Sequence, residues 1–425
     1  MNIHKAGAEN NAYTTQTGGV LRENGQSFCA KGASVHLRFS FIVHYMQISL
    51  SSSGAPWTHG ALLFSALNAF SWREIGSGRG SPISSRRDHT HNMDCLMLKN
   101  EHIFVTGCAG FIGSHLCQSL LEQGAAVVGI DNFDPFYGRA RKEHNLEMIA
   151  QSDTHSRFVF HEMDLCDQEA LAKVMEKAGI TGVVHLAAKA GVRPSITDPG
   201  GYAATNVLGT QSVLSAASQA RCKRVVCASS SSVYGNNTKV PFAETDAVNH
   251  PISPYAATKV SCELIAHAHH HLTGLPIAML RFFTVFGPRQ RPDLAMSLFL
   301  SKVGSGETIN KFGDGTTSRD YTYVDDIVAG IMASYQRIDA HGYRIWNLGG
   351  DHPTTLNELI ATIGEVVGQE PIINEIGMQP GDVERTWADL SRSCDELGYR
   401  PSISIRDGLE KQWAWMQANR EVAGS

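Results

Sequence analysis

The fold is decided by the stretch Ile103-Phe-Val-Thr-Gly-Cys-Ala-Gly-Phe-Ile-Gly113. Its first four residues predict a strand, and the apolar spacing over Phe111–Glu122 predicts a helix. The glycines between them allow a tight turn and a close approach of the backbone to a bound group, and the first amides of a helix have no partner within it. Such glycine strings recur by chance in turns of small residues. The predicted strand before this string and the predicted helix after it favour a dinucleotide-binding turn. We therefore expect a dinucleotide pyrophosphate to bind at Gly107, Gly110, Phe111, Ile112 and Gly113.

Strand and helix patterns alternate outward from this turn. Short apolar runs occupy residues 126–130, 158–160, 182–186 and 224–228, and helical spacing occupies residues 168–177 and 204–219. Alternation of this kind is typical of a parallel sheet covered by helices on both faces. The predicted fold class is α/β, a Rossmann-like doubly wound parallel sheet, whose ligands bind beyond the carboxyl ends of the strands.

The pattern changes after about residue 281. Proline and glycine interrupt the chain there, and helical periodicity returns only at Thr355–Val367 and Arg406–Ala418. We expect residues 97–283 to form the dinucleotide-binding domain. Residues 284–425 are expected to form mainly a smaller mixed domain that binds the substrate.

Residues 1–96 have a different character, rich in Ser, Gly and Asn and without a sustained helical or strand period. Three interpretations are open: a stretch added by a wrongly assigned start codon, a disordered extension, or a targeting peptide. The beginning of the chain contains Glu9 and no early arginine, which disfavours a targeting peptide. We favour the wrongly assigned start codon, because the segment lacks the charge pattern of a targeting peptide. Met93 and Met97 stand just before the first predicted strand.

Composition excludes several classes of partner. The net charge of -5 and the pI near 6.4 give no basic footprint for nucleic acid. No apolar run reaches the ~20 residues that span a bilayer. Nine cysteines without a CxxC pair are typical of reduced thiols in a cytoplasmic protein. The cluster His267, His269, His270 and His271 is followed by no carboxylate at ligand spacing, so we expect no metal site.

Further residues are expected to contact the dinucleotide. Asp131 ends the second predicted strand, where an acidic residue accepts hydrogen bonds from the adenosine ribose and repels a 2′-phosphate, which predicts NAD rather than NADP. The alternative for Asp131 is a turn or helix cap, and for Asp164 a cap of the following helix. The other predicted contacts follow the second, third and fourth strands: Asn132, Asp164, Leu165, Ala187 and Ala188.

The catalytic candidates lie farther along the chain. Tyr255 and Lys259 share one face of a helix. A tyrosine alone is a poor base at neutral pH, but a fixed lysine cation favours the phenolate, which takes a proton from a hydroxyl while hydride leaves the same carbon. Ser230 and Ser232 lie in a serine run at a predicted strand end, where they would hydrogen-bond the reacting oxygen. A tyrosine and a lysine at this spacing are often only a surface pair, and a serine run is often only a polar loop. The order of glycines, serines and then this pair is stronger evidence for an active site.

Together these motifs resemble the extended short-chain dehydrogenase/reductase family of nucleotide-sugar epimerases and dehydratases. The motifs are Gly107–Gly113, Asp131, Ser229–Gly235 and the pair Tyr255 and Lys259, and the resemblance extends from about residue 101 to residue 416. It implies bound NAD, a UDP-sugar substrate and often a homodimer. It also implies that the tyrosine and lysine contact both substrate and cofactor.

The branches of this family differ before the Val-Tyr-Gly string. Dehydratases carry an Asp-Glu pair there, and decarboxylases carry Glu at the second position. This chain has Ser231 and Ser232, which cannot act as a carboxyl acid or base. A 4-epimerase needs no further acid, because its ketone only turns over and takes hydride back on the other face. The resemblance therefore implies an epimerase.

A threonine at position 284 followed by an arginine at position 291 resembles the pattern of the UDP-glucuronate 4-epimerases. Many UDP-glucose 4-epimerases carry Asn at the threonine position. Ala190–Arg193 and Gln379–Val383 share this resemblance. Oxidation of a glucuronate at C4 gives a β-keto acid, which loses carbon dioxide fastest when its carboxylate stands perpendicular to the ketone. A hydroxyl and a guanidinium would hold the carboxylate away from that orientation. The alternative for Arg291 is an exposed loop pair with Asp293.

The resemblance assigns four residues to the substrate: Arg193, Thr284, Arg291 and Arg319. Arg319 would bind the UDP diphosphate, with a surface ion pair as the alternative. The expected reaction converts UDP-glucuronate to UDP-galacturonate with tightly bound NAD. The alternatives are a 4-epimerase of UDP-glucose or UDP-N-acetylglucosamine, a dehydratase, and a non-catalytic NAD sensor. The intact Tyr255 and Lys259 count against the sensor.

Overall fold

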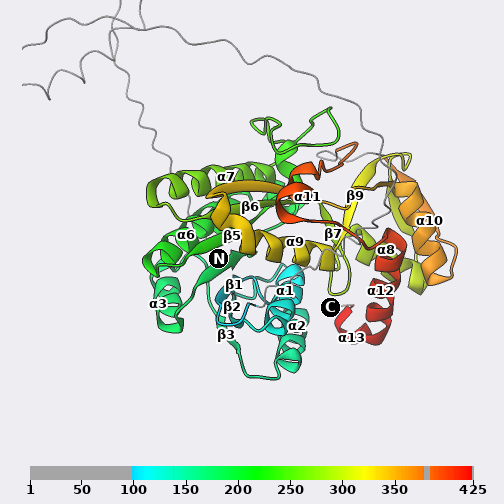
Figure 1. The fold of residues 1–425 in the computed structure, drawn as a ribbon. Coiled ribbons are helices and arrows are strands. Elements are labelled where there is room, and N and C mark those ends of the chain that lie inside the picture. The colour runs from blue at the N-terminus through cyan, green and yellow to red at the C-terminus, as the bar shows by residue number, and fades with distance from the viewer. Residues whose placement is uncertain (1–97, 137, 378–382, 424–425) are drawn as a thin grey trace, which may run out of the picture. The chain divides into compact units, whose positions relative to one another are not determined.

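The computed structural model describes residues 98–136, 138–377 and 383–423, and a seven-stranded sheet dominates them (Figure 1). The favoured start-codon interpretation of residues 1–96 lies outside the described residues. All neighbouring strands are parallel, in the order β10-β6-β5-β4-β1-β2-β3. The strands are β1 His102–Thr106, β2 Ala126–Asp131, β3 Phe158–Glu162, β4 Gly182–His185, β5 Arg224–Ser230, β6 Ile277–Phe282 and β10 Tyr343–Leu348.

Side chains of the central strands alternate between two cores. Ile103 and Val105 of β1 join one core with Leu116, whereas Phe104 joins the other with Leu214. Because successive strand residues point to opposite faces, both faces of the sheet are buried, as the nearly continuous apolar runs predicted. This arrangement confirms the doubly wound α/β fold class.

Helices cover both faces of the sheet, with α1, α2 and α9 packed on the first core and α3, α6 and α7 on the second. The helices of this part are α1 Phe111–Glu122, α2 Arg139–Ser152, α3 Gln168–Ala178, α4 Val192–Thr197, α5 Pro199–Tyr202, α6 Gly209–Gln219, α7 Pro254–Thr273, α9 Val324–Arg337 and α11 Ser391–Leu397. Shorter turns are η1 Ala203–Leu208, a π-helix, and the 3₁₀ helices η2 Ser231–Tyr234 and η3 Ile338–Ala340. None of the described helices is long and apolar enough to cross a membrane.

The strands and helices after residue 283 divide between two places. β10 pairs with β6, α9 packs on β5 and β6, and α11 packs on α9 and β10, so these elements, together with η3, belong with the large sheet. The others form a separate group that includes a three-stranded sheet, β11-β9-β7, and a two-stranded sheet, β12-β8. Its members are β7 Thr284–Phe286, β8 Ile309–Phe312, β9 Ser318–Tyr323, β11 Pro353–Thr355, β12 Ile373–Ile376, α8 Ala295–Ser305, α10 Leu356–Val367, α12 Ile405–Ala418 and α13 Arg420–Ala423. The predicted domain boundary at residue 283 therefore stays a prediction.

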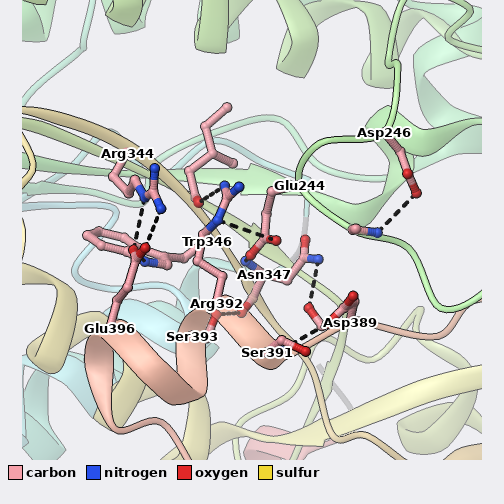
Figure 2. Close-up of polar contacts among 12 residues, drawn as sticks. Glu244, Asp246, Arg344, Trp346, Asn347, Asp389, Ser391, Arg392, Ser393 and Glu396 are labelled. Atoms are coloured by element: carbon pink, nitrogen blue, oxygen red, sulfur yellow. Dashed lines mark hydrogen bonds and ion pairs between the residues drawn. The ribbon is translucent and has the colours of Figure 1, made fainter. Parts of the chain in front are cut away.

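Polar contacts join β10 both to α11 and to the segment that follows the serines at the end of β5 (Figure 2). Glu244 accepts a hydrogen bond from the backbone N–H of Asn347 at 2.8 Å, and burial raises the pKa of this carboxyl. The indole of Trp346 donates to Glu396 at 2.8 Å. The Asn347 side chain also accepts from the Tyr234 hydroxyl at 2.7 Å, which anchors the end of the serine run to β10.

Candidate active site

A cavity of about 360 Å³ opens at the carboxyl ends of the parallel strands. Its wall includes the last residues of β5 and residues that directly follow β1, β2, β4 and β6. The neighbouring strands β1 and β4 mark the point where the strand order reverses. The predicted site residues that line it are Gly107, Gly110, Phe111, Ile112, Gly113, Asp131, Asn132, Asp164, Leu165, Ala187, Ala188, Ser230, Tyr255, Lys259, Thr284 and Arg291. Ser232, Arg193 and Arg319 lie outside this wall.

The glycine turn leaves no room for a side chain at Gly107 or at Gly113. Gly107 has a φ of +70°, and a Cβ on it would lie 2.9 Å from the Ala187 backbone. A Cβ on Gly113 would lie 2.1 Å from the Gly107 carbonyl oxygen. Helix α1 begins after Gly110, which has no capping side chain. The turn therefore keeps its backbone close to the cavity and presents the first helical amides to it.

Asp131 lines the cavity at the end of β2. Its Oδ1 accepts hydrogen bonds from the Phe133 N–H at 2.9 Å and from the Lys142 Nζ at 3.0 Å. The residue thus caps a turn, as the alternative interpretation held, and also lies where a ribose would bind. Lys142 of α2 lines the same cavity and was not predicted, because no sequence pattern marked α2.

Asp164 lines the cavity after β3. The Cys166 N–H donates to it at 2.8 Å, and the Asn132 side chain donates at 2.9 Å. The backbone hydrogen bond from Cys166 lowers the pKa of the Asp164 carboxyl. Helix α3 is capped by Asp167, so the interpretation of Asp164 as its cap is wrong.

The serine run places two hydroxyls in contact. Ser230 Oγ accepts from the Ser232 N–H and donates to Ser232 Oγ, each at 3.1 Å, and thereby caps η2. Ser232 lies one hydrogen bond away from the cavity wall rather than in it. Ser229 Oγ donates a hydrogen bond to Oε1 of the buried Glu263 carboxylate, at 2.6 Å. The sequence did not indicate this interaction.

Helix α7 begins at Pro254, after a capping serine. The Ser253 side chain accepts a hydrogen bond from the Ala256 N–H at 3.1 Å, and Pro254 takes the first helical position, where its missing N–H is not needed. The helix ends at Gly274, whose φ is +73°. These signals define the helix that carries Tyr255 and Lys259.

Tyr255 and Lys259 lie one turn apart on α7, and both line the cavity. Lys259 is buried, and its Nζ donates to the Ala228 carbonyl at 2.8 Å. The Tyr255 ring meets the Tyr202 ring edge to face, with 6.2 Å between centroids. The phenol, the ammonium and Ser230 therefore belong to one cavity.

Thr284 and Arg291 line the same cavity. The Arg291 guanidinium donates to both carboxylate oxygens of Asp293, at 3.0 and 2.7 Å, and to the Ala190 carbonyl at 3.3 Å. It also lies over the Phe136 ring, 4.4 Å from its centroid. The side chain is 13% exposed, so the pair with Asp293 exists but is not the freely exposed pair of the alternative interpretation.

The loop that carries Arg291 is held from several sides. Arg289 donates to the His115 ring at 2.9 Å, which ties the loop to α1. Arg141 donates to the Gln290 carbonyl at 2.8 Å, and Gln412 donates to the Gln290 side chain at 2.9 Å. Burial lowers the pKa of His115 to about 3, so this ring is neutral at pH 7. None of these contacts was predicted, because their partners are far apart in the sequence.

Two predicted arginines have other contacts. Arg193 lies over the Phe312 ring, 4.7 Å from its centroid. Arg319 donates to the carbonyls of Ser318 at 2.9 Å and Glu384 at 3.4 Å. Residues 379–382 of the predicted Gln379–Val383 motif lie outside the described residues. The assignments of both arginines to the substrate remain predictions.

A buried histidine supports the floor of the site. His185 Nδ1 lies 2.8 Å from Thr106 Oγ1, and its Nε2 lies 3.1 Å from Thr210 Oγ1. Thr106 Oγ1 already accepts from the N–H groups of Leu186 and Ala187, so its own hydrogen points to Nδ1 and the ring proton is on Nε2. Burial lowers the pKa of His185 to about 3. This neutral link joins β1 to the turn after β4.

The histidine cluster of α7 makes contacts within the fold. His267 meets the Tyr343 ring edge to face at 5.0 Å, and His269 bonds Ser218 Oγ at 2.7 Å. His270 bonds the Leu275 carbonyl at 2.8 Å.

Residues 103–349 match the model of the NAD dependent epimerase/dehydratase family. This chain belongs to that family. The UDP-glucuronate 4-epimerase of Thermodesulfobacterium geofontis is 38% identical over 325 residues, which cover 76% of this chain and 98% of that protein.

Solved structures of family members are similar as well. The Bacillus cereus UDP-glucuronic acid 4-epimerase in complex with UDP-glucuronic acid and NAD has a TM-score of 0.70 and 36% identity, over 75% of this chain and 99% of that one. The Thermotoga maritima UDP-glucose 4-epimerase with UDP-glucose has a TM-score of 0.66 and 31% identity, over 75% and 99% of the two chains.

NAD is the cofactor of this family, and the cavity fits it. Gly107 and Gly113 carry no side chain at the start of α1, and Asp131 places a carboxylate at the end of β2. Both features fit a dinucleotide. When bound, NAD accepts a hydride and can return it. Tyr255 and Lys259 line the same cavity.

Proposed function

We propose that this family member is a UDP-glucuronate 4-epimerase, which interconverts UDP-glucuronate and UDP-galacturonate with NAD bound throughout. One observation carries the proposal: Thr284 and Arg291 line the same cavity as Tyr255 and Lys259. A carboxylate-binding pair and a proton-transfer pair thus face one ligand space. The similarity to UDP-glucuronate 4-epimerases supports the same substrate.

The proton-transfer residues act at the C4 hydroxyl. Tyr255 takes the hydroxyl proton as hydride leaves C4. The Ser230 hydroxyl, which accepts from the Ser232 N–H, turns its hydrogen from Ser232 Oγ to the substrate and donates to the reacting oxygen. The resulting 4-keto sugar turns its other face to the returning hydride, and the tyrosine gives the proton back. Lys259 favours the phenolate that starts the cycle.

Arg291 has donors left for a substrate carboxylate. A guanidinium carries five N–H groups, and the contacts with Asp293 and Ala190 use three of them. Asp293 holds the guanidinium plane, so that the remaining donors meet the carboxylate in a fixed orientation. With the Thr284 hydroxyl, this contact keeps the carboxylate from the perpendicular arrangement that favours decarboxylation.

A second candidate is a 4-epimerase of neutral UDP-hexoses. The observation that favours it is the complete pairing of Asp293 with Arg291, since a charge-balanced arginine is also compatible with an uncharged sugar. The UDP-glucose 4-epimerase similarity is in keeping with this candidate.

The reaction is tested by NMR of purified full-length protein with UDP-glucuronate and no added NAD. Formation of UDP-galacturonate without UDP-pentose is the expected result. Turnover of UDP-glucose or UDP-N-acetylglucosamine, with none of UDP-glucuronate, would overturn the roles of Thr284 and Arg291 and leave epimerisation in place.

A homodimer and a cytoplasmic location also belong to this proposal. Leu208 of η1 and Leu264 of α7 are 54% and 67% exposed on neighbouring helices, and a second copy would cover them. The described cysteines are free thiols, which supports a reducing compartment. Sedimentation of wild-type protein and Leu264→Lys tests the dimer, and cell fractionation tests the location.

A further inference from the structure

We propose that Lys142 determines cofactor choice through Asp131. Paired with Asp131, the lysine supports binding of the unmodified ribose of NAD. When Asp131 loses its charge, the same lysine binds the 2′-phosphate of NADP. This inference depends on the family's cofactor and is independent of which sugar is the substrate.

The geometry places the lysine at the ribose position. Lys142 Nζ lies 3.0 Å from Asp131 Oδ1, both side chains are 7% exposed, and both residues line the main cavity. The other donor to this oxygen is the Phe133 N–H at 2.9 Å. Among the described residues no group donates to Asp131 Oδ2, so this oxygen is the acceptor that remains for ribose hydroxyls.

Charge explains why wild-type protein prefers NAD. A 2′-phosphate at this position would meet the Asp131 carboxylate, and the lysine charge is already balanced by it. Substitution of Asp131 by Asn removes the repulsion and leaves a buried ammonium beside the space that the phosphate would enter. The hydrogen-bonded ion pair between an ammonium and a phosphate is strong, and added salt weakens it.

Arg139 is the competing cation at this end of the cavity, and its contacts argue against it. Its guanidinium donates to Glu162 at 3.2 and 2.9 Å and to Glu143 at 2.8 Å, and lies 4.0 Å over the Phe133 ring. These partners remain when Asp131 is changed. Arg139 also does not line the cavity, whereas Lys142 does.

The test measures binding, with 2′,5′-ADP and 5′-ADP as probes of the adenosine end. They are titrated calorimetrically into nucleotide-free full-length protein. We expect Asp131→Asn to raise the affinity ratio of 2′,5′-ADP to 5′-ADP at least tenfold at low salt. The double variant Asp131→Asn/Lys142→Gln should lose this gain. The matched control, Asp131→Asn/Arg139→Gln, should keep it.

Three outcomes would overturn the proposal: no gain in folded Asp131→Asn, a gain that survives Lys142→Gln, or a gain that disappears with Arg139→Gln. Lys142→Gln alone provides a second measurement if the Asp131 variants fail to fold. It leaves the carboxylate unbalanced, so 2′,5′-ADP should bind at least threefold more weakly relative to 5′-ADP than in wild-type protein. An unchanged ratio would also overturn the proposal. Thermal melting checks that each variant is folded.

Discussion

The Glu263 carboxylate binds the Arg281 guanidinium through two hydrogen bonds, at 2.9 and 2.7 Å, with both side chains almost fully buried. Ser229 Oγ donates a third hydrogen bond to the same carboxylate. Glu263 stands one turn after Lys259 on α7, and Arg281 and Ser229 belong to the paired strands β6 and β5. The ion pair therefore fixes α7, the helix that carries Tyr255 and Lys259, against β5 and β6.

Glu263→Gln should destabilise the protein by about 3–5 kcal/mol, because it leaves the Arg281 charge buried without its counter-charge. Urea denaturation at neutral pH measures the free energy of unfolding. Glu147→Gln, at an exposed position of α2, is the matched control and should change it by less than ~1 kcal/mol. A loss below 1 kcal/mol for Glu263→Gln would show that the pair is not needed for stability.

Tyr255→Phe should lower kcat by about 10²–10⁴-fold, because the proton on the C4 hydroxyl loses its acceptor while the ring stays in place. The control is Tyr202→Phe, which removes only a hydroxyl that donates to the Ala190 carbonyl at 3.0 Å. Burial raises the pKa of Tyr202 to about 12, so it is no base at neutral pH and its loss should cost far less. Steady-state rates by NMR compare the two variants, and equal losses would contradict the assignment of Tyr255 as the base.

Arg291→Gln should raise the KM for UDP-glucuronate at least tenfold and release some UDP-pentose, because the carboxylate of the 4-keto sugar is no longer held. Product ratios by NMR measure the pentose. Thr284→Val, which removes only a hydroxyl, should show the same effects more weakly. Tight binding of UDP-glucuronate to Arg291→Gln, with no pentose formed, would remove the arginine from the substrate site.

Local patterns were sufficient to predict much of the sheet and many of the residues that line the candidate site. The strand before Gly107, the helix after it, and the start of α7 depend on neighbouring residues, so the sequence shows them directly. β10 is different, because its place beside β6 depends on pairing between residues 343–348 and residues 277–282, which lie far apart in the sequence and leave no local period. Lys142 was missed for the same reason, since it meets Asp131 only when α2 packs beside the end of β2.

Stability should fall as the pH drops from 8 to 5, partly because of His185. Its folded pKa of about 3 lies below the ordinary value of 6.5, so the folded protein binds fewer protons than the unfolded chain between these values. The stability from the neutral ring is therefore complete above about pH 6.5 and is lost progressively below it.

By pH 5 this linkage amounts to about 2 kcal/mol for one such histidine. His185→Gln lacks the titrating ring, so its unfolding free energy should differ between pH 8 and pH 5 by about 2 kcal/mol less than that of wild-type protein. His155→Gln, at an exposed position, should retain the wild-type pH dependence. Urea denaturation at both pH values measures these differences. An unaltered pH dependence in His185→Gln would mean that the ring accepts a proton in the folded protein, and that the Thr106 and Thr210 contacts do not hold it neutral.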